Sequence, residues 1–230
     1  MAVALSKENF LLHKLHSLSG IVPVGFYMTQ HLILNSFSFG GEAYFDGVIN
    51  FFEGMPKHFL LALEIIAIWI PLLFHSVYGM FITNRAKPNY IGTRYGWSQN
   101  RMYTFQRWSG IVIFVFLLMH VTTTTGAKYV ANDADVIKFA AWHQKMMNPL
   151  WLIAYMIGVL TSAYHLGYGV WNFCIRWGIT ISEKAQETVQ KVALGVFVFL
   201  TLAGWVALFG FIIHKPSKPA EQAVLSASLR

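Results

Sequence analysis

Four histidines with a repeated spacing carry the chemistry that this sequence suggests. His31 is followed by His75, 44 residues later, and His120 is followed by His165, 45 residues later. The second histidine of each copy lies in a similar phrase, Phe-His-Ser-Val-Tyr-Gly at 74–79 and Tyr-His-Leu-Gly-Tyr-Gly at 164–169, and the tetrapeptide Ser-Gly-Ile-Val precedes the first histidine at 19–22 and 109–112. Imidazole is the commonest protein ligand of metals. A two-copy pattern that keeps four imidazoles inside apolar stretches predicts a paired ligand set.

The elements that must position these histidines are membrane helices. The chain has 230 residues, of which 56% are hydrophobic and 12% charged, and its mean hydropathy is +0.50. Crossing a hydrocarbon layer of roughly 30 Å takes about 20 mostly apolar residues. Five stretches qualify, at about 17–37, 58–83, 105–125, 149–173 and 189–213. We therefore predict an all-α membrane protein with five transmembrane helices, forming a single membrane domain over 1–213 with an extracytoplasmic tail at 214–230.

Charge and cysteine usage narrow the class of protein further. The net charge of +7 does not indicate a nucleic-acid partner, because the Lys and Arg residues gather at the ends of the spans. The N-terminus, the second loop (84–104) and the fourth loop (174–188) lie on the more basic side, which the positive-inside rule places in the cytoplasm. The C-terminus is then outside. The single cysteine, Cys174, excludes a disulfide framework, a Cys-x-x-Cys-His haem attachment and an iron–sulfur cluster held by this chain alone.

This topology places the histidines in two layers. His31 and His120 lie near the outer ends of their spans, whereas His75 and His165 lie about two turns from the inner ends. If the first four helices form an antiparallel four-helix bundle, the first and third are diagonal, as are the second and fourth. Each pair then faces itself across the bundle axis, which suits a planar macrocycle with one axial nitrogen on each side.

The pattern therefore predicts two haems of b type in a dihaem four-helix bundle. At 1.5 Å rise per residue the two layers are roughly 15 Å apart. Gly79 and Gly169, four residues after the inner histidines, are expected to leave room for the porphyrin edges. A transition-metal site is the main competing interpretation, but its ligands would have to converge at one depth. A haem-free transporter built from parallel repeats is a further alternative.

Other polar residues in or near the spans are candidates for contacts to the haem propionates or to a quinone. His16 and Ser17 begin the first span, Arg107 lies in the third, and Arg176 lies 11 residues after the fourth histidine, on nearly the same helix face. Glu64 is the only acidic residue inside a span. It is either a proton relay to a quinone or a structural helix contact, and its carboxyl is expected to be protonated or hydrogen-bonded.

Short phrases around these positions are similar to a known family. They are Leu-His-Ser-Leu at 15–18, Pro-Val-Gly at 23–25, Gln-His-Leu at 30–32, Ala-Leu-Glu-Ile at 62–65, Pro-Leu-Leu-Phe-His at 71–75 and Ser-Ala-Tyr-His at 162–165. In this order they closely resemble the cytochrome b558 membrane-anchor subunits of Bacillus-like succinate:quinone oxidoreductases. The similarity covers all five spans, about residues 10–213.

The resemblance implies a distal haem on His31 and His120 and a proximal haem on His75 and His165, near the cytoplasm. It also implies two partners, an iron–sulfur subunit and a flavoprotein with FAD on which succinate is oxidised. Electrons would pass from the iron–sulfur subunit through both haems to a quinone, most often menaquinone in dihaem members. The expected location is the bacterial cytoplasmic membrane.

One departure from related enzymes bears on the direction of the reaction. Dihaem fumarate reductases carry a glutamate two residues before the fourth histidine, where this chain has Ala163. This difference favours succinate oxidation over the fumarate reductase alternative. The lysine that relatives place 11 residues after that histidine is Arg176 here, which preserves the cation. The cytochrome b subunit of a hydrogenase or formate dehydrogenase is a further alternative that the flanking phrases disfavour.

Overall fold

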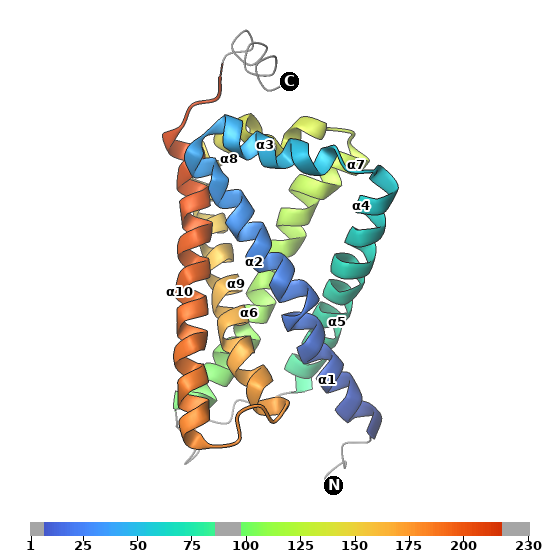
Figure 1. Cartoon of the computed structure of the whole chain (residues 1–230), viewed down its shortest axis with the longest axis vertical. Coiled ribbons are helices and arrows are strands. Elements are labelled where there is room, and N and C mark those ends of the chain that lie inside the picture. The colour runs from blue at the N-terminus through green and yellow to red at the C-terminus, as the bar shows by residue number, and fades with distance from the viewer. Residues whose placement is uncertain (1–6, 86–97, 218–230) are drawn as a thin grey trace. The chain divides into compact units, whose positions relative to one another are not determined.

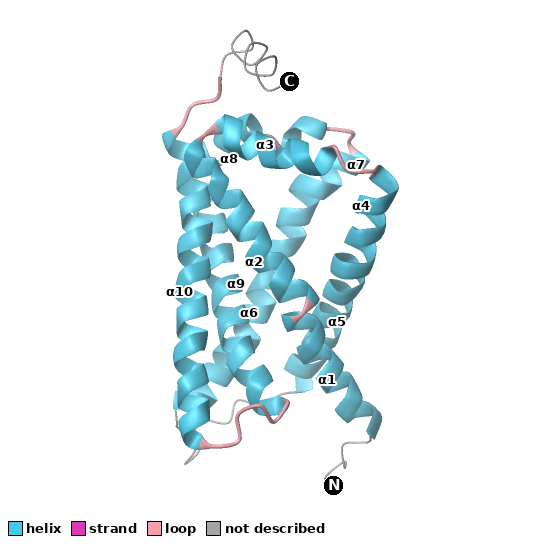
Figure 2. Ribbon diagram, in the orientation of Figure 1, coloured by secondary structure: helices cyan, strands magenta, loops and turns pink. Residues whose placement is uncertain are grey.

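The computed structural model describes residues 7–85 and 98–217, which are helical and contain no strand (Figure 1, Figure 2). The α-helices are α1 (Lys7–Ile21), α2 (Pro23–Asn35), α3 (Glu42–Glu53), α4 (Lys57–Glu64), α5 (Ile70–Arg85), α6 (Ser98–Val121), α7 (Ala127–Val130), α8 (Phe139–Met147), α9 (Pro149–Arg176) and α10 (Glu183–Ile213). Shorter segments join them: 3₁₀ turns η1 (Ser36–Gly40) and η4 (Ala134–Ile137), and π-helical turns η2 (Ile65–Trp69) and η3 (Thr122–Gly126).

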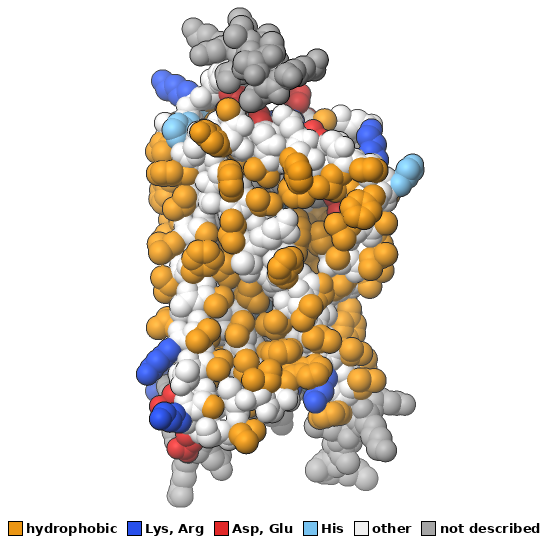
Figure 3. Space-filling model, in the orientation of Figure 1, with side chains coloured by type: hydrophobic (Ala, Val, Ile, Leu, Met, Phe, Trp, Pro, Cys, Tyr) orange, Lys and Arg blue, Asp and Glu red, His pale blue; other side chains and the backbone are white. Residues whose placement is uncertain are grey.

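Four continuous helical stretches are long and apolar enough to cross a membrane within the described ranges. They are Lys57–Arg85, Asn100–Val130, Pro149–Arg176 and Glu183–Ile213, and each encloses one of the predicted spans. Many of their apolar side chains are exposed, including Ile66 (68%), Leu73 (67%) and Val77 (60%). Figure 3 shows such hydrophobic side chains covering the visible helix faces, as contact with lipid requires.

The first predicted span, 17–37, is divided between two helices. Helix α1 ends at Ile21, Val22 forms a turn, and α2 begins at Pro23. Proline has no N–H to donate and disfavours helical geometry in the residue before it, which explains the break at this point. Neither half alone is as long as the four continuous stretches, so a fifth span stays a prediction.

The described residues fall into two compact units. The first, which we call the His75 unit, comprises 7–29, 61–85, 98–115 and 160–200. In it α1 packs against α5, and Tyr168, Trp171 and Ala193 form the buried core. Two residues after the end of α9, Gly178 lies in the left-handed region (φ +69°), which allows the N–H of Ile179 to return to the carbonyl of Cys174 at 2.9 Å.

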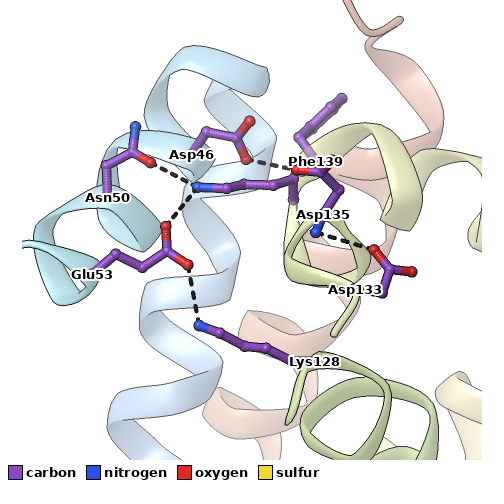
Figure 4. Close-up of polar contacts among 8 residues, drawn as sticks. Asp46, Asn50, Glu53, Lys128, Asp133, Asp135 and Phe139 are labelled. Atoms are coloured by element: carbon purple, nitrogen blue, oxygen red, sulfur yellow. Dashed lines mark hydrogen bonds and ion pairs between the residues drawn. The ribbon is translucent and has the colours of Figure 1, made fainter. Parts of the chain in front are cut away.

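The second unit, which we call the His120 unit, comprises 30–60, 116–159 and 201–217. Its buried hydrophobic core is Phe45, Phe139, Trp142, Met146, Tyr155, Val159, Leu208 and Phe211. Helix α3 supplies Phe45 to this core. Its Asp46 accepts a 2.8 Å hydrogen bond from the N–H of Phe139, the first residue of α8 (Figure 4). This contact satisfies an N–H that has no partner within α8.

A small charged network joins α3 to α7 and to the residue that precedes α8. Glu53 accepts hydrogen bonds from Lys128 and Lys138, each at 3.1 Å, and Lys138 also donates to Asn50 at 2.7 Å (Figure 4). Partial burial acts to raise the pKa of Glu53, but the two lysines outweigh it and lower that pKa below its ordinary value. Burial raises the pKa of Asp46, in spite of its hydrogen bond from Phe139.

Two predictions fall partly or wholly outside the described residues. The basic residues Lys87 and Arg94, which weigh in the orientation argument, lie in 86–97. Most of the predicted tail lies in 218–230. Its first residues, 214–217, contact the His120 unit: His214 Nε2 lies 2.9 Å from the carbonyl of Phe39, and the N–H of Ser217 donates to Glu42 at 2.6 Å.

Candidate functional site

In the His75 unit, the structure brings together the two histidines that the sequence assigns to the inner layer. His75 comes from α5 and His165 from α9. Their ring centroids are 6.1 Å apart and the ring planes are nearly perpendicular, at 89°. Both side chains are partly buried.

The Nδ1 atom of each ring contacts a neighbouring helix, α1 for His75 and α6 for His165. His75 Nδ1 lies 2.9 Å from the carbonyl of His16, which can only accept, so Nδ1 donates. His165 Nδ1 lies 3.1 Å from the carbonyl of Gln106 and 3.0 Å from Ser109 Oγ, which itself donates to that carbonyl. Both imidazoles therefore carry their proton on Nδ1 and keep the lone pair on Nε2, as is usual for metal-binding histidines whose orientation is fixed by an outer hydrogen bond.

The two copies of the sequence repeat make the same contacts. The acceptor carbonyls belong to His16 and Gln106, which precede the Ser-Gly-Ile-Val tetrapeptides by the same three residues. A Cβ on the first tetrapeptide glycine, Gly20, would lie 2.6 Å from His75 Nδ1, and one on Gly110 would lie 3.7 Å from His165 Nδ1. The tetrapeptide thus marks where a helix passes closely beside the imidazole of another.

The first copy has one more residue than the second between glycine and first histidine, 11 against 10. The break at Val22 falls inside this interval, whereas α6 is a continuous α-helix from Gly110 to His120. On an unbroken helix, one residue rotates a side chain by about 100°. The break in the first copy therefore explains how intervals of 11 and 10 residues can place His31 and His120 in the same pair.

Gly79 and Gly169 face side chains rather than the open space expected beside them. A Cβ on Gly79 would lie 3.0 Å from His16 Nε2, and one on Gly169 would lie 3.5 Å from Gln106 Nε2. The His16 ring stacks on that of His75, with centroids 4.1 Å apart and planes 7° from parallel. These glycines lie beside His16 and Gln106, and the porphyrin edges expected next to them stay a prediction.

Three of the predicted propionate or quinone contacts lie near this pair. His16 is close enough to Arg176 for an electrostatic effect, and Arg176 Nη1 donates to the carbonyl of His13 at 3.3 Å. Ser17 Oγ donates to a carbonyl of α1 and accepts a 3.0 Å hydrogen bond from Trp177 Nε1, so its hydroxyl is engaged on both sides. Burial and the Arg176 guanidinium lower the pKa of His13.

Arg107 is placed differently from the other candidates. Its Nη2 donates to Thr104 at 3.2 Å and its guanidinium lies 4.8 Å from the ring centroid of Tyr103, so the contacts shown are within its own helix. Glu64 ends α4 immediately before the π-helical turn η2 and is partly buried. It lies near enough to Tyr27 for an electrostatic interaction. Its role as a proton relay stays a prediction.

In the His120 unit, the two histidines that the sequence assigns to the outer layer also meet. The rings of His31 on α2 and His120 on α6 have centroids 5.9 Å apart and planes at 79°. His120 Nδ1 lies 3.2 Å from the hydroxyl of Tyr155 on α9. Trp142 of α8 closes this site, since its buried indole lies 6.3 Å from the His120 ring and 5.3 Å from that of Tyr155.

Both pairs fit axial ligation of a haem iron. With metal–nitrogen bonds of about 2 Å and about 1 Å from each nitrogen to its ring centroid, two imidazoles on one iron have centroids about 6 Å apart. The separations of 5.9 and 6.1 Å match this value. Among the side chains that the structure describes, no three from His, Cys, Asp or Glu gather in a way that suits a metal ion.

Two buried polar atoms near the inner pair also suit a bound group. The hydroxyl of Tyr78 and Oε1 of Gln106 are buried without a hydrogen-bond partner in the described structure. The Tyr78 ring lies 5.5 Å from that of His13 and 5.8 Å from that of His16. Buried polar groups are normally satisfied, so an unpaired hydroxyl in this position indicates a ligand acceptor or a water.

Comparison with known proteins assigns the chain to a family. No family model matches it. Over 205 residues, however, it is 34% identical to the succinate dehydrogenase cytochrome b558 subunit of Bacillus subtilis (strain 168), covering 89% of this chain and 98% of that relative. The chain belongs to the succinate dehydrogenase cytochrome b558 subunit family. The predicted family and the membrane-anchor role are thereby confirmed, and neither the fumarate reductase nor the transporter alternative is favoured.

Most residues that hold and cover the histidines were not identifiable from the sequence alone. The repeated tetrapeptides were the available signal for Ser109 and for the close approach of Gly20 and Gly110. Trp142 and Tyr155 had no such signal, because they reach His120 from α8 and α9, and only packing reveals which faces of these helices meet it.

Proposed function

We propose that this cytochrome b558 subunit binds two haems of b type, one on His75 and His165 and the other on His31 and His120, within a five-span membrane domain. The observation that carries the proposal is the pair of imidazole separations near 6 Å, each between histidines of different helices. When bound, the haems would supply one-electron transfer, with both axial positions filled and therefore little tendency to bind oxygen.

The protein's own residues would prepare these sites for electron transfer. Main-chain carbonyls of His16 and Gln106 hold Nδ1 of His75 and His165, which leaves Nε2 of each imidazole as the nitrogen that would bind iron. Fixing the two imidazoles in this way would limit their movement when a bound haem gains or loses an electron. Arg176 and Tyr78 are the cation and the hydroxyl that would neutralise or bind the propionates of the inner haem.

We infer that electrons arrive from an iron–sulfur subunit, which receives them from a flavoprotein subunit that oxidises succinate, and leave to a quinone, here assigned as menaquinone. The inferred orientation has the N-terminus and the His75 pair towards the cytoplasm of a bacterium. The relative's name, succinate dehydrogenase subunit, supports a multi-subunit enzyme. Ala163, fully buried in α9, supports succinate oxidation because it has no carboxyl to relay a proton there.

The pairing is tested by removing one ligand from each unit of the assembled complex. His120→Ala is expected to remove the outer haem and to leave the inner haem reducible by succinate, and His165→Ala to remove the inner haem. His143→Ala is the matched control, because His143 lies in the His120 unit and its Nδ1 binds the carbonyl of Phe211. Redox difference spectra of the b-type α band measure the outcome. Loss of both haems or of neither in His120→Ala would contradict the pairing.

A further inference from the structure

Lys145 is a cation in unusual surroundings within the His120 unit. It lies on α8 and is partly buried. Its Nζ donates to the carbonyl of Thr123 at 3.3 Å and lies 4.6 Å from the ring centroid of Trp142 and 5.5 Å from that of Trp151. The ammonium is thus held in one place by a carbonyl and two indole faces.

No acidic side chain balances this charge within the part of the chain that the structure describes. The ion pairs there join Lys128 and Lys138 to Glu53, and none involves Lys145. Burial lowers the pKa of Lys145 below its ordinary value. A partly buried cation with neutral neighbours is suited to bind an anion that arrives with a ligand.

The position of Lys145 identifies which ligand this is. Trp142, whose indole face the ammonium covers, is the same residue that lies beside the His120 ring. The ammonium is also near enough to His120 for an electrostatic effect on its imidazole. The cation therefore lies beside the proposed outer haem site, and the anionic groups of a haem are its two propionates.

We propose that Lys145 binds a propionate of the haem held by His31 and His120. This inference rests on the proposed function. A carboxylate at this ammonium forms a charge-assisted hydrogen bond where the flanking indoles limit access of water. The positive charge also favours the reduced haem, which has one positive charge fewer than the oxidised haem. Lys145 is then both an anchor for the outer haem and a determinant of its potential.

The test is a potentiometric titration of the b-type α band in the purified complex, with Lys145→Gln compared to Lys145→Arg. Lys145→Gln is expected to shift the ratio of reduced to oxidised outer haem about tenfold towards the oxidised form at a fixed potential, equivalent to about 59 mV for one electron. The inner haem should not change. Lys145→Arg, which keeps a cation that can stack on indole, should retain the original potential. Lys128→Gln removes a cation of the same unit that already pairs with Glu53 and serves as the control.

Each result decides the proposal. Loss of the outer haem in Lys145→Gln, with retention in Lys145→Arg, supports it. An unchanged outer-haem potential in Lys145→Gln overturns it, as does haem loss in both variants, because the charge would then not matter. A raised KM for quinone with an unchanged potential would assign the ammonium to the quinone instead and also overturns it. Absence of any b-type band in the unmodified complex would refute the proposed function itself, which is a separate outcome.

Discussion

Replacing Gly20 with alanine is expected to displace His75. The new Cβ would clash with His75 Cε1 and lie 2.6 Å from its Nδ1, so the imidazole would have to retreat by more than an ångström to reach ordinary contact. It has little room, because Nδ1 donates to the carbonyl of His16 at 2.9 Å and the ring stacks on the His16 imidazole at 4.1 Å. Overpacking costs about 1–3 kcal/mol, and the lost hydrogen bond costs about 1 kcal/mol more.

The second copy of the repeat supplies a matched comparison. In Gly110→Ala the new Cβ would lie 3.7 Å from His165 Nδ1 and 3.2 Å from its Cε1, which a small adjustment relieves. Gly195→Ala is the control, since a Cβ there would meet nothing within 4 Å. Alanine should stabilise that exposed position of α10 by up to about 1 kcal/mol.

The assay is the haem content of the purified complex, with the potential of each b-type component. Gly20→Ala should cost about 2–4 kcal/mol. This cost should lower the binding constant of the inner haem, or its ratio of reduced to oxidised form at a fixed potential, at least tenfold. Gly110→Ala should have a small effect on the same haem, and Gly195→Ala none. Both haems retained at unchanged potentials in Gly20→Ala, or a larger effect in Gly110→Ala, would refute the steric reasoning.

Two further predictions concern the His120 unit. Tyr155→Phe removes the hydroxyl 3.2 Å from His120 Nδ1 and should weaken outer-haem retention by about 10–100-fold, measured as haem transfer to a scavenger protein; faster loss of the inner haem instead would count against the assignment. Glu53→Gln breaks two ion pairs and should lower the free energy of unfolding at pH 7 by about 0.2–1 kcal/mol per pair, because the site is partly exposed. Thermal unfolding measures the change. Because the lysines lower the pKa of Glu53, its stabilising effect is present above the ordinary value of 4.5 and is lost as pH falls through the lowered value. A difference between wild type and variant that is equal at pH 3 and pH 7 would contradict this linkage.

The approach of the histidine rings in pairs could be predicted from the sequence because it depends on only two properties, the depth of each histidine in its span and the order of the helices. Spans of sufficient length set the depth of each imidazole, and antiparallel order sets which helices are diagonal. The structure brings His75 close to His165 and His31 close to His120, as that argument requires. Four of the five spans were likewise readable, since continuous apolar stretches of this length are rare outside membranes.

The environment of the histidines could not be read in the same way. The turn at Val22 depends on whether neighbouring groups compensate the missing N–H of Pro23, and sequence does not show neighbours. The contact of Gly79 with His16 was not readable either, because helix rotation shows which face a glycine occupies but not which side chain lies beside it. The position of Lys145 beside Trp142 could not be read from the sequence, because their distance depends on the fold of α8.

Electron paramagnetic resonance of the oxidised complex tests the central claim, that each unit holds one haem between two histidines, most directly. The ring planes of the two pairs are nearly perpendicular, at 79° and 89°. Such an arrangement leaves the iron orbitals nearly degenerate and gives strongly anisotropic low-spin signals. We predict two such signals, one lost in His120→Ala and the other in His165→Ala. A single signal, or high-spin iron in the unmodified complex, would contradict the account.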